Sequence, residues 1–222
     1  MGLFNIKTLG AAATALCLSG FSASAATLLF DDDFERSANN SVGFGWTEVA
    51  RSENDVRILN NDDETNGRVL LRDSVDRNGP AGSIDAGIRS STIDATGFEN
   101  LEVTFRWRAR ANNAATDTLN VSFSDIASPG LGDLSDWTNV FSTDSSVLTT
   151  NTTETIFLTG VSDTEFSLFF STEVANNNSA FVLFGVSVVG DEIAVVPLPA
   201  GMPLMLLGLG ALGVAHRRST KG

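Results

Sequence analysis

Residues 101–110 read Leu-Glu-Val-Thr-Phe-Arg-Trp-Arg-Ala-Arg, and their unbroken alternation of apolar and polar side chains decides the fold class. Successive side chains of a β-strand point to opposite faces of its sheet, so the alternation predicts a strand. The Leu, Val, Phe, Trp and Ala side chains face one way, and the Glu, Thr and three Arg side chains face the other. Trp107 is therefore expected in the core.

Shorter alternating segments recur along the chain, and clusters of Gly, Pro, Asn, Asp and Ser separate them. No long segment with the 3.6-residue period of a helix competes with this pattern. A chain of eleven short strands predicts an all-β protein, specifically a two-sheet antiparallel β-sandwich or jelly roll. The predicted strands are 27–30, 45–50, 56–60, 68–72, 84–89, 101–110, 118–124, 137–141, 153–159, 165–171 and 181–189.

The last predicted strand is apolar on both faces. Strict alternation places one set of side chains on one face of it and the intervening set on the other. The first set is Phe181, Leu183, Gly185, Ser187 and Val189, and the second is Val182, Phe184, Val186 and Val188.

The N-terminus has the pattern of an export signal. Lys7 supplies a positive charge, residues 9–21 form an apolar stretch of small residues, and Ala23-Ser24-Ala25 matches the A-x-A cleavage pattern. We therefore expect residues 1–25 to be a signal peptide and the mature chain to begin at Ala26.

The last 27 residues form a second signal, in three parts. The motif Val196-Pro197-Leu198-Pro199-Ala200 precedes an apolar segment, 202–215, and a basic end, 216–222, that contains Arg217, Arg218 and Lys221. A transmembrane helix needs about 20 apolar residues, so this segment is short unless the bilayer thins around it. Positive charge keeps the C-terminus cytoplasmic. By itself the pattern also fits a permanent C-terminal anchor.

These three parts resemble the VPLPA-CTERM sorting signal, a variant of the PEP-CTERM class, and all five motif residues are present. The resemblance implies recognition by an exosortase, a membrane-embedded cysteine transpeptidase, in a Gram-negative cell that makes extracellular polysaccharide. The tail would be cut near the motif. The two signals then bracket one exported domain, 26–195, followed by the tail, 196–222. We expect this domain in the cell envelope, held by the C-terminal helix before processing, and afterwards at the cell surface or outside.

The exported domain lacks several reactive side chains. Cys17 leaves with the signal, His216 lies in the tail, Lys7 and Lys221 are the only lysines, and the chain has no tyrosine. These absences exclude a Ser-His-Asp triad, a Cys-His dyad, a Schiff-base lysine and a His- or Cys-ligated metal. Carboxylates remain, for acid–base chemistry or for calcium.

The charge of the exported domain excludes another class of partner. All 27 acidic residues lie there against ten of the 14 basic residues, which leaves a net charge of −17. This charge repels nucleic acid and anionic lipid headgroups. The same composition also fits a plain solvated acidic surface.

A weaker resemblance concerns the layout of the domain. The opening Asp31-Asp32-Asp33-Phe34-Glu35-Arg36, the segment 43–48 and the last strand, 180–189, resemble jelly-roll modules of the carbohydrate-binding, concanavalin-A-like and galactose-binding-like kind. The resemblance implies that the first and last strands pair and that a structural calcium lies beside them. Such modules carry an aspartate near the middle of the last strand, where this chain has Gly185.

Three groups of residues are candidate binding sites. Asp31, Asp32 and Asp33 could supply calcium ligands, although three adjacent acids on a strand cannot all face one ion, and a solvated loop is the alternative. Trp46 and Trp137 adjoin turns and could stack on sugar rings, with core positions as the alternative.

The third group, Arg106, Arg108 and Arg110, forms a basic ridge on one sheet face that could contact an anionic polymer or pair with the many acids. The leading interpretation is a non-catalytic cell-surface or extracellular-matrix protein, sorted by an exosortase-type system and associated with extracellular polysaccharide. A calcium-assisted glycan-binding module is the first alternative. A β-sandwich glycoside hydrolase is the second, and it needs two acids that face each other across a groove.

Overall fold

The computed structural model describes residues 25–50, 52–59, 67–72, 84–110, 117–131, 134–144, 150–174 and 179–194. The predicted sorting tail and all but the last residue of the predicted signal peptide lie outside these ranges. Within them, no helix is long and apolar enough to cross a membrane. The described chain consists of twelve strands and one short 3₁₀ helix.

The first sheet is built around the long strand β12 (Ala180–Glu192). β7 (Phe98–Ala109) pairs along one side of β12, while β4 (Arg68–Arg72) and β1 (Thr27–Asp32) follow each other along the other side. β10 lies outside β7, and β3 lies outside β4. The bounds of these two strands are Thr152–Phe157 for β10 and Val56–Leu59 for β3.

The second sheet is built in the same way around β11 (Glu165–Glu173). β8 (Thr118–Ser124) pairs along one side of β11, and β5 and the short β6 share the other side. β2 lies outside β5, and β9 lies outside β8. The remaining bounds are Thr47–Ala50 for β2, Ala86–Arg89 for β5, Ile93–Asp94 for β6, Leu134–Asp136 for the 3₁₀ helix η1 and Thr138–Asp144 for β9.

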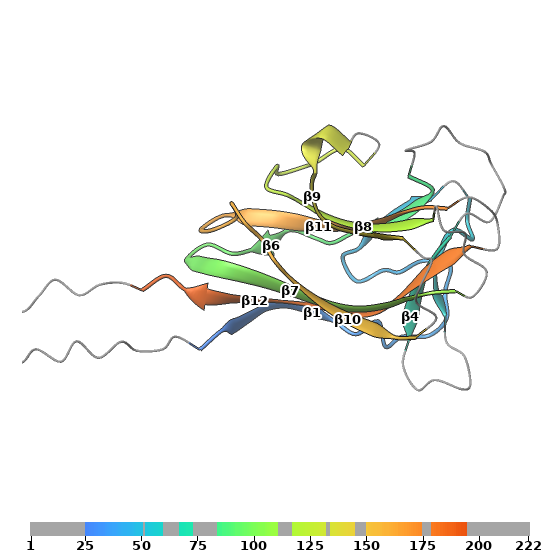
Figure 1. Ribbon diagram of the computed structural model, residues 1–222, viewed down its shortest axis with the longest axis horizontal. Helices are drawn as coiled ribbons and strands as arrows, with labels where there is room; N and C mark the ends of the chain where they lie inside the picture. Colours follow the sequence, from blue (N-terminus) through green and yellow to red (C-terminus); the bar gives the residue numbers. More distant parts are fainter. Residues whose placement is uncertain are drawn as a thin grey trace, which may run out of the picture.

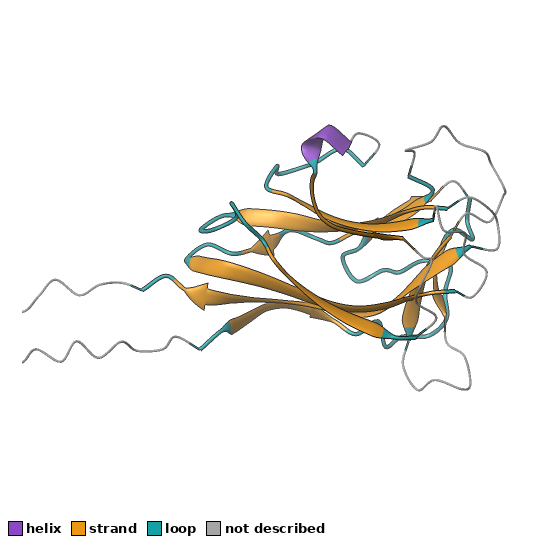
Figure 2. Cartoon of the chain, in the orientation of Figure 1, coloured by secondary structure: helices purple, strands orange, loops and turns teal. Residues whose placement is uncertain are grey.

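The two sheets stack face to face, and every strand pair is antiparallel (Figures 1 and 2). The predicted two-sheet antiparallel sandwich is therefore confirmed. Each of the eleven predicted strands has a counterpart, whereas the two-residue β6 was not predicted. The first and last strands pair as expected, with Leu28 opposite Val189 and Asp32 opposite Val186.

The alternation of β7 builds the centre of the core. Leu101, Val103, Phe105, Trp107 and Ala109 are at most 2% exposed, as the sequence predicted. Phe105 contacts the ring of Phe170 from the second sheet edge-on, with the ring centroids 5.5 Å apart. Aromatic pairs of this kind hold the two sheets together with about 0.5–1.5 kcal/mol each beyond the area they bury.

The predicted face assignment of β12 is wrong in its second half. The register against β7 shifts between Leu183 and Gly185, so Phe184 is an extra residue in a β-bulge. A bulge reverses the facing of the residues that follow it. Val186 and Val188 consequently join Phe181 and Leu183 in the main core, although strict alternation placed them on the opposite face.

Candidate functional site

The most distinctive hollow of the described chain lies in the loop between β1 and β2. It has a volume of about 390 Å³. Four of its seven lining residues have polar side chains, and Phe44 is an exposed aromatic residue among them. The lining residues are Arg36, Ser37, Asn39, Ser41, Val42, Gly43 and Phe44, which we call the Phe44 pocket.

Phe44 is held on the protein surface by an uncommon backbone conformation. Its side chain is 80% exposed. Its φ is 52°, and Gly43 and Gly45 on either side also have positive φ, at 65° and 85°. A left-handed conformation costs a non-glycine residue about 1–2 kcal/mol. The N–H of Trp46 donates to the Gly43 carbonyl over 3.1 Å and closes this turn.

The carboxylate of Asp32 holds the groups of the pocket together through hydrogen bonds. Asp32 Oδ1 accepts hydrogen bonds from the backbone N–H of Phe34 at 2.8 Å and from Arg36 Nη1 at 3.2 Å. Asp32 Oδ2 accepts from Arg36 Nη2 and from Trp46 Nε1, both at 2.7 Å. The two-point contact fixes the plane of the guanidinium, because Arg and carboxylate match as two parallel forks.

The fixed guanidinium in turn covers one face of the exposed ring. Arg36 Cζ lies 4.6 Å from the ring centroid of Phe44 and 5.3 Å from that of Phe34. A cation above an aromatic face is attracted by its negative quadrupole. The pocket thus combines an oriented cation, an aromatic ring with much of its surface open, and nearby hydroxyl and amide groups. Such a combination can pack against the C–H face of a sugar ring and hydrogen-bond its hydroxyls.

Trp46 does not offer the stacking face that the sequence interpretation considered. It is 8% exposed and belongs to the main core. Its ring lies against Phe30, Phe34 and Phe170, with centroids 5.6–6.2 Å apart. Its role in the pocket is to support Asp32 through the indole N–H.

Trp137 is buried in a different place, on the outer face of the second sheet. It is also 8% exposed, and its ring lies 4.9 Å from that of Phe169. Its indole N–H donates to the Gly130 carbonyl at 2.8 Å. Phe169 is buried because the segment that carries Trp137 covers the outer face of β11. Trp46 and Trp137 therefore do not share one sheet face.

The structure does not bring Asp31, Asp32 and Asp33 together as a group of metal ligands. Both oxygens of Asp32 are occupied by N–H donors, and Asp33 Oδ1 accepts from the backbone N–H of Glu35 at 2.9 Å. Across the described ranges, no three His, Cys, Asp or Glu side chains gather closely enough to hold a metal ion. Gly185 lies beside this segment. A Cβ added to Gly185 would be 3.5 Å from the carbonyl oxygen of Asp32.

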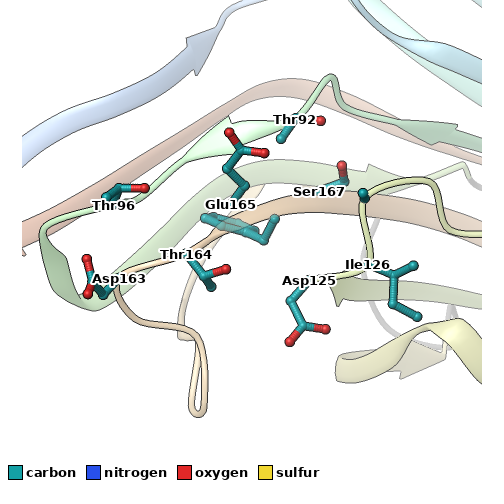
Figure 3. A pocket seen from close by; sticks show the side chains of 10 residues that line it. Thr92, Thr96, Asp125, Ile126, Asp163, Thr164, Glu165 and Ser167 are labelled. Atoms are coloured by element: carbon teal, nitrogen blue, oxygen red, sulfur yellow. The ribbon is translucent and has the colours of Figure 1, made fainter.

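A second hollow, of about 340 Å³, lies at one end of the second sheet and is lined by three carboxylates and four hydroxyl-bearing residues. Figure 3 shows that Glu165 points toward Thr92, whereas Asp125 points away to the opposite side. The carboxylate of Asp163 accepts the backbone N–H of Gly97 at 2.7 Å. These acids do not face each other across the hollow, as a pair of glycosidase carboxylates must.

Sequence reasoning missed Phe44 and Arg36. Exposure of an aromatic residue cannot be read from its type, since most phenylalanines are buried. The local signal was the Gly-Phe-Gly sequence at residues 43–45, because flanking glycines allow the positive φ angles that turn the ring outward.

Comparison with known proteins gives the fold only. No family model and no curated protein matches the chain. A cleaved adhesin domain of Lys-gingipain from Porphyromonas gingivalis is 15% identical, with a TM-score of 0.51, over 74% of this chain and 99% of that one. The CBM22-1 xylan-binding domain from Paenibacillus barcinonensis is 13% identical, with a TM-score of 0.45, over 78% of this chain and all of that one. The chain thus shares the β-sandwich of an adhesin domain.

Proposed function

We propose that this chain is a non-catalytic cell-surface or extracellular-matrix protein that binds extracellular polysaccharide through the Phe44 pocket. The observation that carries the proposal is an aromatic ring held 80% exposed by a strained backbone, with an oriented guanidinium on one face. Strain of this kind persists where the surrounding structure enforces it, commonly at ligand sites. The Trp46–Asp32–Arg36 network provides that enforcement.

Two further facts support a binding role. The Lys-gingipain domain with a similar fold is described as an adhesin domain. The exported domain also lacks the His, Cys, Lys and Tyr side chains on which most hydrolytic and eliminating sites depend.

Sorting by an exosortase through Val196–Ala200 is the second part of the proposal. The motif, the apolar segment and the basic end support it. Replacing Pro197 and Pro199 with alanine should leave the full-length chain in the membrane fraction of the producing cell. Unchanged processing of that variant would refute sorting and leave the binding proposal intact.

The binding proposal is tested with the purified full chain and the extracellular polysaccharide of its producer. Phe44→Ala should weaken binding at least about fivefold, because an anchoring aromatic contributes more than about 1 kcal/mol. Phe157→Ala is the matched control, since Phe157 is also exposed, at 64%, but lies on the edge strand β10.

Equal binding by wild type and Phe44→Ala, with the fold intact, would refute the pocket assignment. Repeating the assay with calcium and with a chelator addresses the calcium-assisted alternative. Binding that needs calcium would favour that alternative, with ligands other than Asp32.

A further inference from the structure

A group of arginines gathers on the outer face of the first sheet. Val69 and Leu71 of β4, and Val56 and Ile58 of β3, point into the main core, so their neighbours along each strand point outward. The even-numbered residues of β7 point outward in the same way. These positions hold five of the eight arginines in the described part of the chain, and a sixth, Arg110, directly follows β7. The six are Arg57, Arg68, Arg72, Arg106, Arg108 and Arg110.

Strand pairing arranges these residues, which we call the arginine face, in rows across the sheet. Ala180 of β12 lies between Arg72 of β4 and Arg110, whose backbone N–H donates to the Ala180 carbonyl at 3.0 Å. In the next row, Val182 lies opposite Arg108 on one side. Arginines two residues apart on β7 are separated by about 7 Å along the strand.

An apolar strip lies beneath the arginines and orients them. It comprises Leu70, Ala180, Val182 and Phe184, with Leu59 packed against it. Arg106 Cζ and Arg108 Cζ lie 5.0 and 5.4 Å from the ring centroid of Phe184, the residue of the bulge. The ring of Phe184 thus lies outside the main core, next to Val182, and its face meets two guanidinium groups.

Positive charge accumulates on this face although the domain as a whole is strongly acidic. Desolvation lowers the pKa of Arg72, and the like charges of Arg57 and Arg110 lower it further, against an opposing effect of Asp55. Two neighbouring guanidinium groups and one carboxylate therefore act on Arg72. Arg110 is exposed, and Arg57, Arg72 and Arg106 are half-buried, so an anion can reach them.

We infer that the arginine face is a second binding surface, which takes a carboxylate-bearing polysaccharide such as a polymer of uronic acid. Guanidinium groups bind carboxylates through two parallel hydrogen bonds, and repeated carboxylates on an extended polymer can contact several rows at once. Charge complementarity confines the polymer to this face, because the net charge of −17 repels it elsewhere on the domain.

The inference rests on the proposed association with polysaccharide for the choice of polymer, but it does not depend on the Phe44 pocket. The probe is polygalacturonate, and its methyl-esterified form serves as the uncharged control. The purified full chain should bind polygalacturonate, bind the ester far more weakly, and lose affinity as salt screens the charges.

Substitutions then locate the binding. Arg110→Gln should weaken binding about two- to fivefold, as expected for one exposed ion pair. Arg106→Gln/Arg110→Gln should weaken it about tenfold. Lysine at both positions should restore part of the affinity, because the charge returns without the planar fork. Arg89→Gln on the second sheet is the control and should bind as wild type does.

Three outcomes would overturn the inference. They are full affinity in the folded double variant, an equal loss in Arg89→Gln, and equal binding of the esterified polymer. Phe44→Ala separates the two proposals, since it should retain polygalacturonate binding. If Phe44→Ala alone loses that binding, polygalacturonate binds at the Phe44 pocket. That result would refute the arginine face as the binding surface and support the proposed function.

Discussion

Asp32→Asn should be among the most destabilising polar substitutions in the described chain. Asp32 accepts four hydrogen bonds, and its side chain is 10% exposed, against 15% for Arg36. The change to asparagine removes the negative charge and points an NH₂ group at two donors. Either Arg36 and the indole of Trp46 or the backbone N–H of Phe34 then lose their acceptor.

The expected magnitude follows from those contacts. A hydrogen bond to a charged group contributes about 1.5–3 kcal/mol, and a buried donor left without an acceptor costs about 1–3 kcal/mol. Removing one partner of a buried pair costs about 3–5 kcal/mol in all. Because both partners of this pair retain some exposure, we expect the lower end, about 3 kcal/mol.

Urea denaturation of the full chain, with tryptophan fluorescence as the signal, measures the change in unfolding free energy. Asp33→Asn is the matched control, because Asp33 is exposed and accepts one hydrogen bond, from Glu35. It should shift stability by less than about 0.5 kcal/mol. If the two variants differ by less than about 1 kcal/mol, the hydrogen bonds of Asp32 do not hold the pocket together.

Two other predictions concern backbone packing and acid stability. Gly67→Ala should prevent stable folding, because a Cβ there would lie 1.8 Å from the Phe34 carbonyl oxygen. Gly185→Ala should be tolerated, because the atom nearest to its added Cβ is 3.5 Å away. Circular dichroism of the two variants distinguishes a folded from an unfolded chain. The pKa of Asp94 is lowered from 3.8 by the backbone N–H and side chain of Thr96, so its contribution to stability is present above that pH and is lost as pH falls through the folded value. Asp94→Asn should therefore flatten the acid limb of a stability–pH curve, and an unchanged limb would show that the bond to Thr96 has no energetic effect.

The sequence predicted the sandwich well because alternation is a local signal. The five inward residues of 101–110 are all buried, and each predicted strand is present. The same local rule failed at Phe184, where one extra residue exchanges the faces of Val186 and Val188. The position of a bulge depends on how the partner strand pairs, which the residues of a single strand do not encode.

The candidate site was less accessible to sequence reasoning. Asp32 and Trp46 were singled out for ligand contact, yet they lie beneath the pocket and orient Arg36. The sequence shows that a carboxylate and an indole N–H are present. It does not show that Asp32 and Trp46, 14 residues apart, form a hydrogen bond. Burial of Trp137 likewise depends on a loop that folds back over Phe169, a tertiary effect without a local pattern.

The central position of β12 has a mechanical consequence. This strand has neighbours on both sides and ends at Glu192, so any pull applied through the residues that follow enters the domain along it (Figure 1). A pull directed along the strand loads the hydrogen bonds to β7, β4 and β1 together in shear and does not open them one after another. A domain anchored by its C-terminal side would therefore resist drag on a bound polymer better than one anchored through an edge strand.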